Sequence, residues 1–452
     1  MNKKIILTII AIFLVIVCIF IYNSIDKYYE RFERLAQDNN FTQQLKKLIP
    51  NNIKSFIKEI ISEKIVNYDE FQFKNNELQL KTLGEVKLQF KTFTSPFLKL
   101  AGLRSYISYY NQNLFLTTGT GILMYTSFDT LKEKNIVFKK IDNNFEDIAG
   151  KDYVEWAKSL VKNLFIKNNK VYLSYVKKIK ENCFTNAVLV ANLNLENIVF
   201  KEFFDTKECQ PFYDGQTGGN LSDYKNDKIL MSIGDHHSYE DPRQANNNPQ
   251  NLNSLIGKII SIDENTGKYE ILSMGHRNSQ GLYYDAKDNI IFSTDHGPQG
   301  GDEININTSP DGEIKNYGWG FSSYGEHYGY PERDNSKLYK IAPLKKSHSE
   351  YGFVEPIKYF TPSIAPTQII KTEKFIKIPG KTILYIGTLG WHVEEGDLSV
   401  HQLILNEALN VEEHNIMPVN ERVRDMIYIE ELNKIFLFLE SSGSIGILEL
   451  NN

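Results

Sequence analysis

The sequence lacks a basic excess, an unusual share of glycine or proline, and a cysteine framework. Its 51 lysine and arginine residues face 56 aspartate and glutamate residues, a net charge of -5, so it has no basic surplus for a nucleic-acid backbone. Its 28 glycines and 14 prolines in 452 residues are too ordinary for a disordered chain, and 41% of the residues are hydrophobic. We therefore expect a folded protein with a large core and no nucleic-acid partner.

Only three cysteines are present, and none of them has the spacing of a metal site. Cys18 lies in an apolar run at the amino end, whereas Cys183 and Cys209 lie 26 residues apart in the polar part of the chain. If that part faces an oxidising compartment, the two can form a disulfide; otherwise they are two free buried thiols. The sequence leaves both alternatives open.

Long apolar runs are absent except at the amino end, where residues 5–22 carry no charged side chain. At about 1.5 Å per residue this run spans roughly 27 Å, close to a bilayer core. A cleaved signal peptide is the alternative, but the run exceeds a usual signal core and no small-residue cleavage site follows it. We expect residues 1–27 to be an uncleaved single-pass anchor in a bacterial inner membrane, with the soluble domain facing the periplasm. The flanking lysines and arginines alone leave the orientation open.

Residues 28–69 have a helical pattern, because apolar residues recur at intervals of three and four. The stripe consists of Ile53, Phe56, Ile57, Ile60, Ile61 and Ile65. This periodicity predicts an amphipathic helical stalk next to the membrane.

From residue 70 onward one short pattern recurs: a polar turn, four or five apolar residues, and then small or polar residues. The first apolar residues of the six copies are Leu114, Val171, Ile229, Ile290, Ile383 and Ile435. Similar hairpins occur in any large all-β protein, but near-regular spacing without intervening helices is typical of a radial repeat. We therefore predict an all-β fold, a six-bladed β-propeller over residues 70–452, with the polar strand ends around one mouth.

The segment GHRNSQGLYYDAKDNIIFSTDHGPQGGDEIN, residues 275–305, has two polar clusters around a predicted hairpin. Residues 281–284 and 290–294 read as strands, and residues 285–289 read as the turn. Because a hairpin returns to where it started, His276 to Asn278 and Asp295 to Pro298 are expected at the same rim of one sheet.

Five segments, GHRNSQGL, DHGPQGGDEIN, NYGWG, TPSIAP and RVRDM, in this order, resemble the pyrroloquinoline quinone-dependent aldose sugar dehydrogenases, the glucose/sorbosone dehydrogenase family. The first two blocks together are the most specific part. The resemblance implies a six-bladed propeller that transfers a hydride from a sugar hydroxyl to the quinone, with calcium as Lewis acid and an electron acceptor as partner.

The resemblance also implies roles for individual residues. Cofactor binding would fall to Arg277, Asn278, Arg422 and Arg424, since guanidinium groups suit carboxylate recognition. Calcium would be held partly by the main-chain carbonyls of Gly297 and Pro298, with Asp302 and Glu303 nearby, and Glu303 would serve a second, structural calcium.

Two departures from the family pattern bear on catalysis. Gln216 stands where the family has its catalytic histidine, and a carboxamide does not take up a proton at ordinary pH. Its companion acid is present as Asp235, and the candidate substitute bases are His236, His237 and His296. Gly390 stands where a cofactor lysine is expected.

Two functions follow from this pattern. The first is a membrane-anchored quinoprotein dehydrogenase acting on a small sugar or alcohol. The second is a non-catalytic, calcium-stabilised propeller that binds a carbohydrate or protein ligand, since a fold does not guarantee an activity. A calcium-dependent lactonase-like hydrolase would also fit a propeller mouth, but the HRN and RVRD blocks do not support it.

Overall fold

The computed structural model describes residues 69–101, 104–211, 215–236, 248–325, 347–391 and 393–451. They form mostly strands, with three short α-helices, α4 (Pro96–Ala101), α5 (Phe145–Ala149) and α6 (Lys151–Ala157). No helix within these ranges is long and apolar enough to cross a membrane. The anchor predicted for residues 1–27, and the stalk predicted for residues 28–69 except its last residue, lie outside the described residues and stay predictions.

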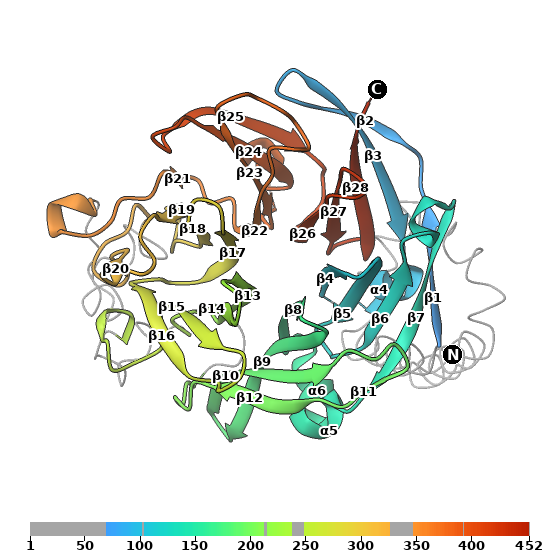
Figure 1. Cartoon of the computed structure of the whole chain (residues 1–452), viewed down its shortest axis with the longest axis horizontal. Helices are drawn as coiled ribbons and strands as arrows, with labels where there is room; N and C mark the ends of the chain where they lie inside the picture. Colours follow the sequence, from blue (N-terminus) through green and yellow to red (C-terminus); the bar gives the residue numbers. More distant parts are fainter. Residues whose placement is uncertain are drawn as a thin grey trace, which may run out of the picture. The chain divides into compact units, whose positions relative to one another are not determined.

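The strands fall into six groups of four that surround a central axis (Figure 1). From the inner strand outward, the groups are β4 (Ser105–Tyr110), β5 (Asn113–Thr118), β6 (Leu123–Ser127) and β7 (Asn135–Asn143); β8 (Val161–Lys167), β9 (Lys170–Lys180), β10 (Cys183–Asn192) and β12 (Lys201–Asp205); β13 (Gly218–Tyr224), β14 (Lys228–Ile233), β15 (Lys258–Asp263) and β16 (Tyr269–Met274); β17 (Ser279–Asp285), β18 (Ile290–Asp295), β19 (Asp302–Asn307) and β21 (Lys358–Phe360); β22 (Pro366–Lys371), β23 (Thr382–Thr388), β24 (Ser399–Leu405) and β25 (Val411–Pro418); and β26 (Val423–Ile429), β27 (Lys434–Leu439), β28 (Ser444–Leu450) and β3 (Val86–Thr94). The remaining strands pair at outer edges: β1 (Glu70–Asn75), β2 (Gln79–Leu83), β11 (Asn197–Ile198) and β20 (Lys315–Asn316).

The ring is closed by strands from the two ends of the described chain. Strand β28 pairs antiparallel with β3, so an early strand completes the last group. In Figure 1 the dark red β28 accordingly lies beside the blue β3. The inner strands also contact one another in turn, and β26 contacts β4. This all-β arrangement is consistent with the predicted six-bladed propeller.

The repeated pattern in the sequence marks one strand of each group. The six first apolar residues all lie in second strands, namely β5, β9, β14, β18, β23 and β27. These strands are covered on both sides, which explains why they read as continuous apolar runs such as KIFLFL in β27 rather than as alternating ones.

The hydrophobic core is divided among the spaces between neighbouring groups. One cluster, for example, joins Val188 of β10 to Ile229 of β14 and Ile260 of β15, all fully buried. Another joins Phe292 of β18 to Leu384 of β23. Apolar side chains thus fill the spaces between neighbouring groups. Polar side chains lie at the starts of the inner strands instead.

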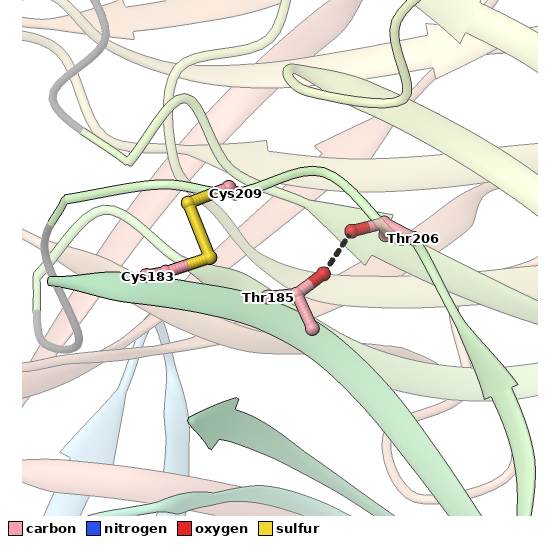
Figure 2. Close-up of a disulfide and its surroundings, with 4 residues drawn as sticks. All are labelled: Cys183, Thr185, Thr206 and Cys209. Carbon is pink, nitrogen blue, oxygen red and sulfur yellow. Dashed lines mark hydrogen bonds between the residues drawn. A yellow bond between two sulfur atoms is a disulfide. The ribbon is translucent and has the colours of Figure 1, made fainter. Parts of the chain in front are cut away.

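The alternatives left open for the two cysteines are resolved in favour of a disulfide. Cys183, at the start of β10, is joined to Cys209 in the segment after β12, and their Cα atoms lie 4.9 Å apart (Figure 2). Beside it the hydroxyl groups of Thr185 and Thr206 form a hydrogen bond of 2.5 Å. Strand β10 is thus linked to the chain that follows β12.

Candidate active site

A cavity of about 810 Å³ lies at the starts of the six inner strands. Six of the residues singled out in the sequence line it: Gln216, Asn278, His296, Gly390, Arg422 and Arg424. Tyr106 of β4, Lys162 of β8 and Ala365, just before β22, complete the contribution of all six inner strands. Of the polar strand ends that the sequence predicts around one mouth, STDHG and GTLG line this cavity, through His296 and Gly390.

Asp295 joins the two polar clusters of the 275–305 segment. Its carboxylate accepts hydrogen bonds from the backbone N–H of Asn278 at 2.6 Å and of Arg277 at 3.2 Å. The Nδ1 atom of His276 lies 3.1 Å from the same carboxylate. Strands β17 and β18 pair Ser279 with Asp295, so the clusters meet at one rim as the hairpin predicts.

Arg277 lies behind the cavity wall. Its guanidinium donates to the carbonyl oxygens of His296 at 3.1 Å and Gly297 at 2.6 Å, and it lies over the Trp319 ring, 5.3 Å from the centroid. It lines a second compartment of about 10 Å³, which has room for a single water-sized particle. In this arrangement Arg277 holds the turn that bears Gly297 and the buried Pro298.

Asp302 is saturated by internal hydrogen bonds. Its two carboxylate oxygens accept from the N–H groups of Gly297, Ile364 and Ala365 at 2.7 to 2.8 Å, and from the Ser363 hydroxyl at 3.3 Å. Four donors occupy the acceptor positions of a carboxylate. Asp302 therefore ties the turn after β18 to the TPSIAP segment.

Glu303 is also engaged within the protein. Its carboxylate lies 2.8 Å from Nε2 of His348 and accepts from the Asn305 amide at 3.2 Å, while the other ring nitrogen of His348 contacts the Ser322 hydroxyl. Burial raises the pKa of Glu303, and His348 opposes that rise. No group of three or more histidine, cysteine or acidic side chains in the described ranges is arranged to hold a metal.

Gln216 lies in the cavity wall, where its backbone passes close to the backbone of Gly234. It is 7% exposed with a φ of 50°, and its carbonyl accepts from the N–H of His236 at 2.9 Å. Gly234 is required there, because a Cβ on it would come within 2.0 Å of the Gln216 carbonyl oxygen. His236 is fully buried, and its Nε2 contacts the Asn186 side chain rather than lining the cavity.

Asp235 lies fully buried beneath this backbone contact. Its carboxylate accepts from the Trp319 indole N–H at 2.7 Å, and its backbone N–H donates to the Arg277 carbonyl at 2.7 Å. Asp235, Trp319 and Arg277 thus form a stack behind the wall. His237 lies outside the described residues.

Of the three candidate bases, His296 lines the cavity. Its Nε2 lies 2.8 Å from the Pro366 carbonyl, which needs a proton on that nitrogen, so Nδ1 is left as the acceptor. The Asn278 amide lies 3.3 Å from Nδ1. Burial lowers the pKa of His296, although nearby carboxylates and the Pro366 bond oppose this, so the ring is neutral at pH 7.

Three arginines share one carboxylate at the opposite wall; we call Arg104, Arg422, Arg424 and Glu440 the arginine cluster. The Nε atoms of Arg422 and Arg104 lie 3.3 Å and 4.0 Å from Glu440, and Arg424 forms a shorter ion pair with it. Burial alone would raise the pKa of Glu440, but the three guanidiniums hold it below its usual range. All three arginines line the cavity.

The lysine expected at position 390 is sterically excluded. A Cβ on Gly390 would come within 1.8 Å of Oδ2 of Asp397, the atom that accepts the Trp391 backbone N–H at 2.7 Å. Trp391 itself is 76% exposed at the cavity wall, and the Arg422 guanidinium lies over its ring, 4.3 Å from the centroid.

Sequence reasoning missed several residues of the site. Trp391 follows directly after the GTLG strand end, and this place at a predicted strand end was a signal that it could line the mouth. Trp319 lies within the NYGWG segment that carries part of the resemblance. Arg104, Lys162 and His348 stand in no motif, and only the fold brings them to the site.

The model of the glucose/sorbosone dehydrogenase family matches residues 156–446, more than half of the chain. The chain therefore belongs to the glucose/sorbosone dehydrogenase family. It is 31% identical over 212 residues to aldose sugar dehydrogenase YliI of Escherichia coli (strain K12), covering 43% of this chain and 52% of that protein. It is 27% identical over 225 residues to an uncharacterized protein of Synechocystis sp., covering 46% of this chain and 50% of that protein. The match thus spans about half the length of these relatives.

Solved structures share the fold. The soluble aldose sugar dehydrogenase of Escherichia coli in its apo form superposes with a TM-score of 0.58 at 19% identity, covering 76% of this chain and 96% of that one. The quinone domain of pyranose dehydrogenase from Coprinopsis cinerea, in its holo form, superposes with a TM-score of 0.54 at 11% identity, covering 77% and 92%. At these identities the likeness concerns the fold.

Proposed function

We propose that this chain is a membrane-anchored, quinoprotein-type sugar dehydrogenase that oxidises a small sugar or alcohol with pyrroloquinoline quinone. The observation that carries the proposal is the single cavity that brings together Asn278, His296, Arg422 and Arg424. These residues come from strands far apart in the sequence, and their chemistry suits an anionic quinone beside a sugar hydroxyl. Family membership and the fold of the quinone-domain neighbour support the same reaction class.

The arginines at one wall suit the cofactor. When bound, the quinone would supply a two-electron acceptor for a hydride from the sugar carbon. Arg422 and Arg424 would hold its carboxylates, since both line the cavity and guanidinium pairs with carboxylate in a bidentate fashion. Asn278 keeps its own place by accepting from the N–H of Gly218 at 3.1 Å and the Gln280 amide at 2.8 Å.

His296 is the residue that we assign as base. Its neutral ring keeps Nδ1 as acceptor, and a substrate hydroxyl can take the place of the long Asn278 contact to donate its proton there. The Pro366 carbonyl would then stabilise the resulting imidazolium through Nε2. Gln216, buried in the same wall, would bind sugar hydroxyls as donor and acceptor.

Calcium fits the observed arrangement only in part. The Gly297 carbonyl accepts from the Arg277 guanidinium, and Asp302 and Glu303 are both engaged internally. We therefore route no step through calcium and keep its binding as a prediction. Melting curves of the protein with calcium and with chelator test it: calcium raises the melting temperature if it binds the native state, and Glu303→Ala lessens that rise.

We also propose that the propeller faces the periplasm from an inner-membrane anchor. The uncharged run of residues 5–22 supports the anchor, and the Cys183–Cys209 disulfide supports an oxidising compartment. Fractionation with membranes, and retention of residue 1 in the mature protein, are the expected results. A mature amino end near Asn23 would contradict the anchor.

The test of catalysis uses the full chain in detergent, incubated with pyrroloquinoline quinone and calcium. Bound-quinone absorbance after desalting, and dye-linked sugar oxidation, are measured for the natural protein, His296→Asn and Gln216→His. Activity lost in His296→Asn by about 10²-fold or more identifies the base. Activity that appears only in Gln216→His would mean an intact pocket that has lost its base.

The carboxamide of Gln216 favours one alternative, a calcium-stabilised propeller that binds a carbohydrate or protein ligand without oxidising it. In that case neither the natural protein nor Gln216→His binds the quinone. Sugar binding without quinone uptake would then replace the dehydrogenase proposal.

A further inference from the structure

Trp391 presents a large aromatic surface to the cavity rather than to a core. It is 76% exposed, follows the end of β23, and is held by the bond from its N–H to Asp397. One face of the indole carries the Arg422 guanidinium at 4.3 Å from the ring centroid. Arg422 also donates to the carbonyl of Gly390 at 3.5 Å, which joins β26 to the same loop. A flat indole fixed in this way suits a planar ligand.

Cationic side chains gather beside Trp391. Arg104, Arg422 and Arg424 all line the cavity, and their guanidinium groups surround the carboxylate of Glu440. With Lys162, Glu395 and Asp397, the cavity lining carries four cationic and two acidic side chains. Such a lining suits a ligand that carries carboxylates better than it suits a neutral sugar.

We propose that Trp391, Arg104 and Arg422 form a binding shelf for a planar aromatic carboxylate, at the wall where Asp397 leaves no room for a lysine at position 390. The indole stacks on the ligand ring, and the guanidiniums of Arg104 and Arg422 bind its carboxylates. This inference rests on the proposed function, in which the ligand is the quinone cofactor. It assigns Trp391 and Arg104, which stand in no family motif, to cofactor binding.

Tryptophan fluorescence tests the shelf directly, because the chain has only three tryptophans. Trp156 lies on α6, 59% exposed and away from the cavity lining, and Trp319 is 5% exposed behind the wall. The full chain in detergent is titrated with pyrroloquinoline quinone, and quenching is compared with the bound fraction measured by equilibrium dialysis. Trp156→Phe is the matched control, and Trp391→Tyr keeps an aromatic ring at the shelf.

We expect Trp391→Phe to lose most of the quenching and Trp391→Tyr to retain binding. A stacking contact corresponds to roughly a threefold to tenfold change in Kd, and a guanidinium–carboxylate bond to about tenfold or more. Arg104→Gln should therefore weaken binding about tenfold, with a smaller dependence on salt than the natural protein shows. Trp156→Phe should bind as the natural protein does.

The failures of the two proposals are distinguishable. If the quinone binds, but Trp391→Phe keeps the full quenching and Arg104→Gln binds as tightly as Trp156→Phe, the shelf is overturned while the dehydrogenase proposal stands. If no protein takes up the quinone, the dehydrogenase proposal fails, and pyridine-2,3-dicarboxylate replaces it as probe. If that probe binds, with its quenching lost in Trp391→Phe and its affinity weakened in Arg104→Gln, the shelf is supported; absence of binding overturns it.

Discussion

The two walls of the cavity differ in the partners of their charged side chains. The wall of β17 to β19, which we call the motif wall, carries residues 276–278 and 295–303. Asp295 and Asp302 in this wall accept hydrogen bonds from backbone N–H groups, and Glu303 is held by the His348 and Asn305 side chains. The arginine cluster, across the cavity, has three cations on one carboxylate and an exposed indole beside it. The segments that most resemble the family therefore serve largely to hold the turn in place. The guanidinium groups that line the cavity lie on the other wall.

The largest effect should come from removing a saturated carboxylate of the motif wall. Asp302→Ala leaves the buried N–H group of Ile364 and the partly buried N–H groups of Gly297 and Ala365 without their acceptor. Each buried donor so orphaned costs about 1–3 kcal/mol, so the free energy of unfolding should fall by about 3 kcal/mol or more. Urea unfolding measures it.

The control for this change is Asp311→Ala. Asp311 is a carboxylate with 57% side-chain exposure, paired with Lys225, and its loss should change the unfolding free energy by less than about 1 kcal/mol. Equal losses in the two variants would mean that the motif wall is not held by Asp302.

A second effect should come from Asp425, which lies behind the arginine cluster. It is fully buried and accepts from the N–H of Ile107 at 2.8 Å, so it joins β26 to β4. Burial raises its pKa to about 7, against the opposing effect of two backbone N–H groups and Arg424. Because the folded state holds this proton more tightly than the unfolded chain, the contribution of Asp425 to stability is fully present below about pH 4 and is lost as the pH rises through about 7.

Comparison with Asp425→Asn isolates this titration. At about 1.4 kcal/mol per pKa unit, the natural protein should lose roughly 2–3 kcal/mol relative to the variant between about pH 5 and about pH 8. Urea unfolding at the two pH values gives the difference. A gap between the two proteins that stays constant with pH would contradict the raised pKa.

The sequence predicts the motif wall far better than the arginine cluster. A hairpin must return to its own rim, so the meeting of His276 to Asn278 with Asp295 to Pro298 follows from local periodicity. The repeat likewise marks the second strand of each group, because doubly covered strands read as apolar runs. Local patterns therefore carry most of the fold.

The arginine cluster depends on contacts that no local pattern encodes. Arg104 precedes β4 and Glu440 follows β27, and ring closure brings them together across more than three hundred residues. The exclusion of lysine at position 390 likewise depends on Asp397, which is visible only once the loop is folded. The sequence predicted Arg422 and Arg424 through the resemblance, and the structure adds the partners that set their charge.

The third prediction concerns Gly390→Lys, which places the cofactor lysine expected from the family beside the arginine cluster. Gly390→Lys forces a Cβ against Asp397 and should cost about 1–3 kcal/mol of unfolding free energy, the usual range for overpacking. Adding Asp397→Ala removes the obstacle and should recover part of that loss. Thermal unfolding of the single and double variants checks this, and a single variant as stable as the natural protein would show that the loop moves freely.

The smallest effect on stability should come from Arg104, which lines the cavity and whose charge we propose serves a ligand. Its side chain is 36% exposed, and at 4.0 Å its attraction to Glu440 competes with repulsion from Arg422. Arg104→Gln should therefore change the unfolding free energy by less than about 1 kcal/mol, raising it slightly at low salt, and sodium chloride should shrink the difference. Arg424→Gln is the matched comparison: Arg424 is 8% exposed and bonded to Glu440, so its loss leaves that buried carboxylate less compensated and should destabilise at every salt concentration. If urea unfolding instead finds Arg104→Gln as damaging as Arg424→Gln, all three arginines are structural, and the contrast between the two walls disappears.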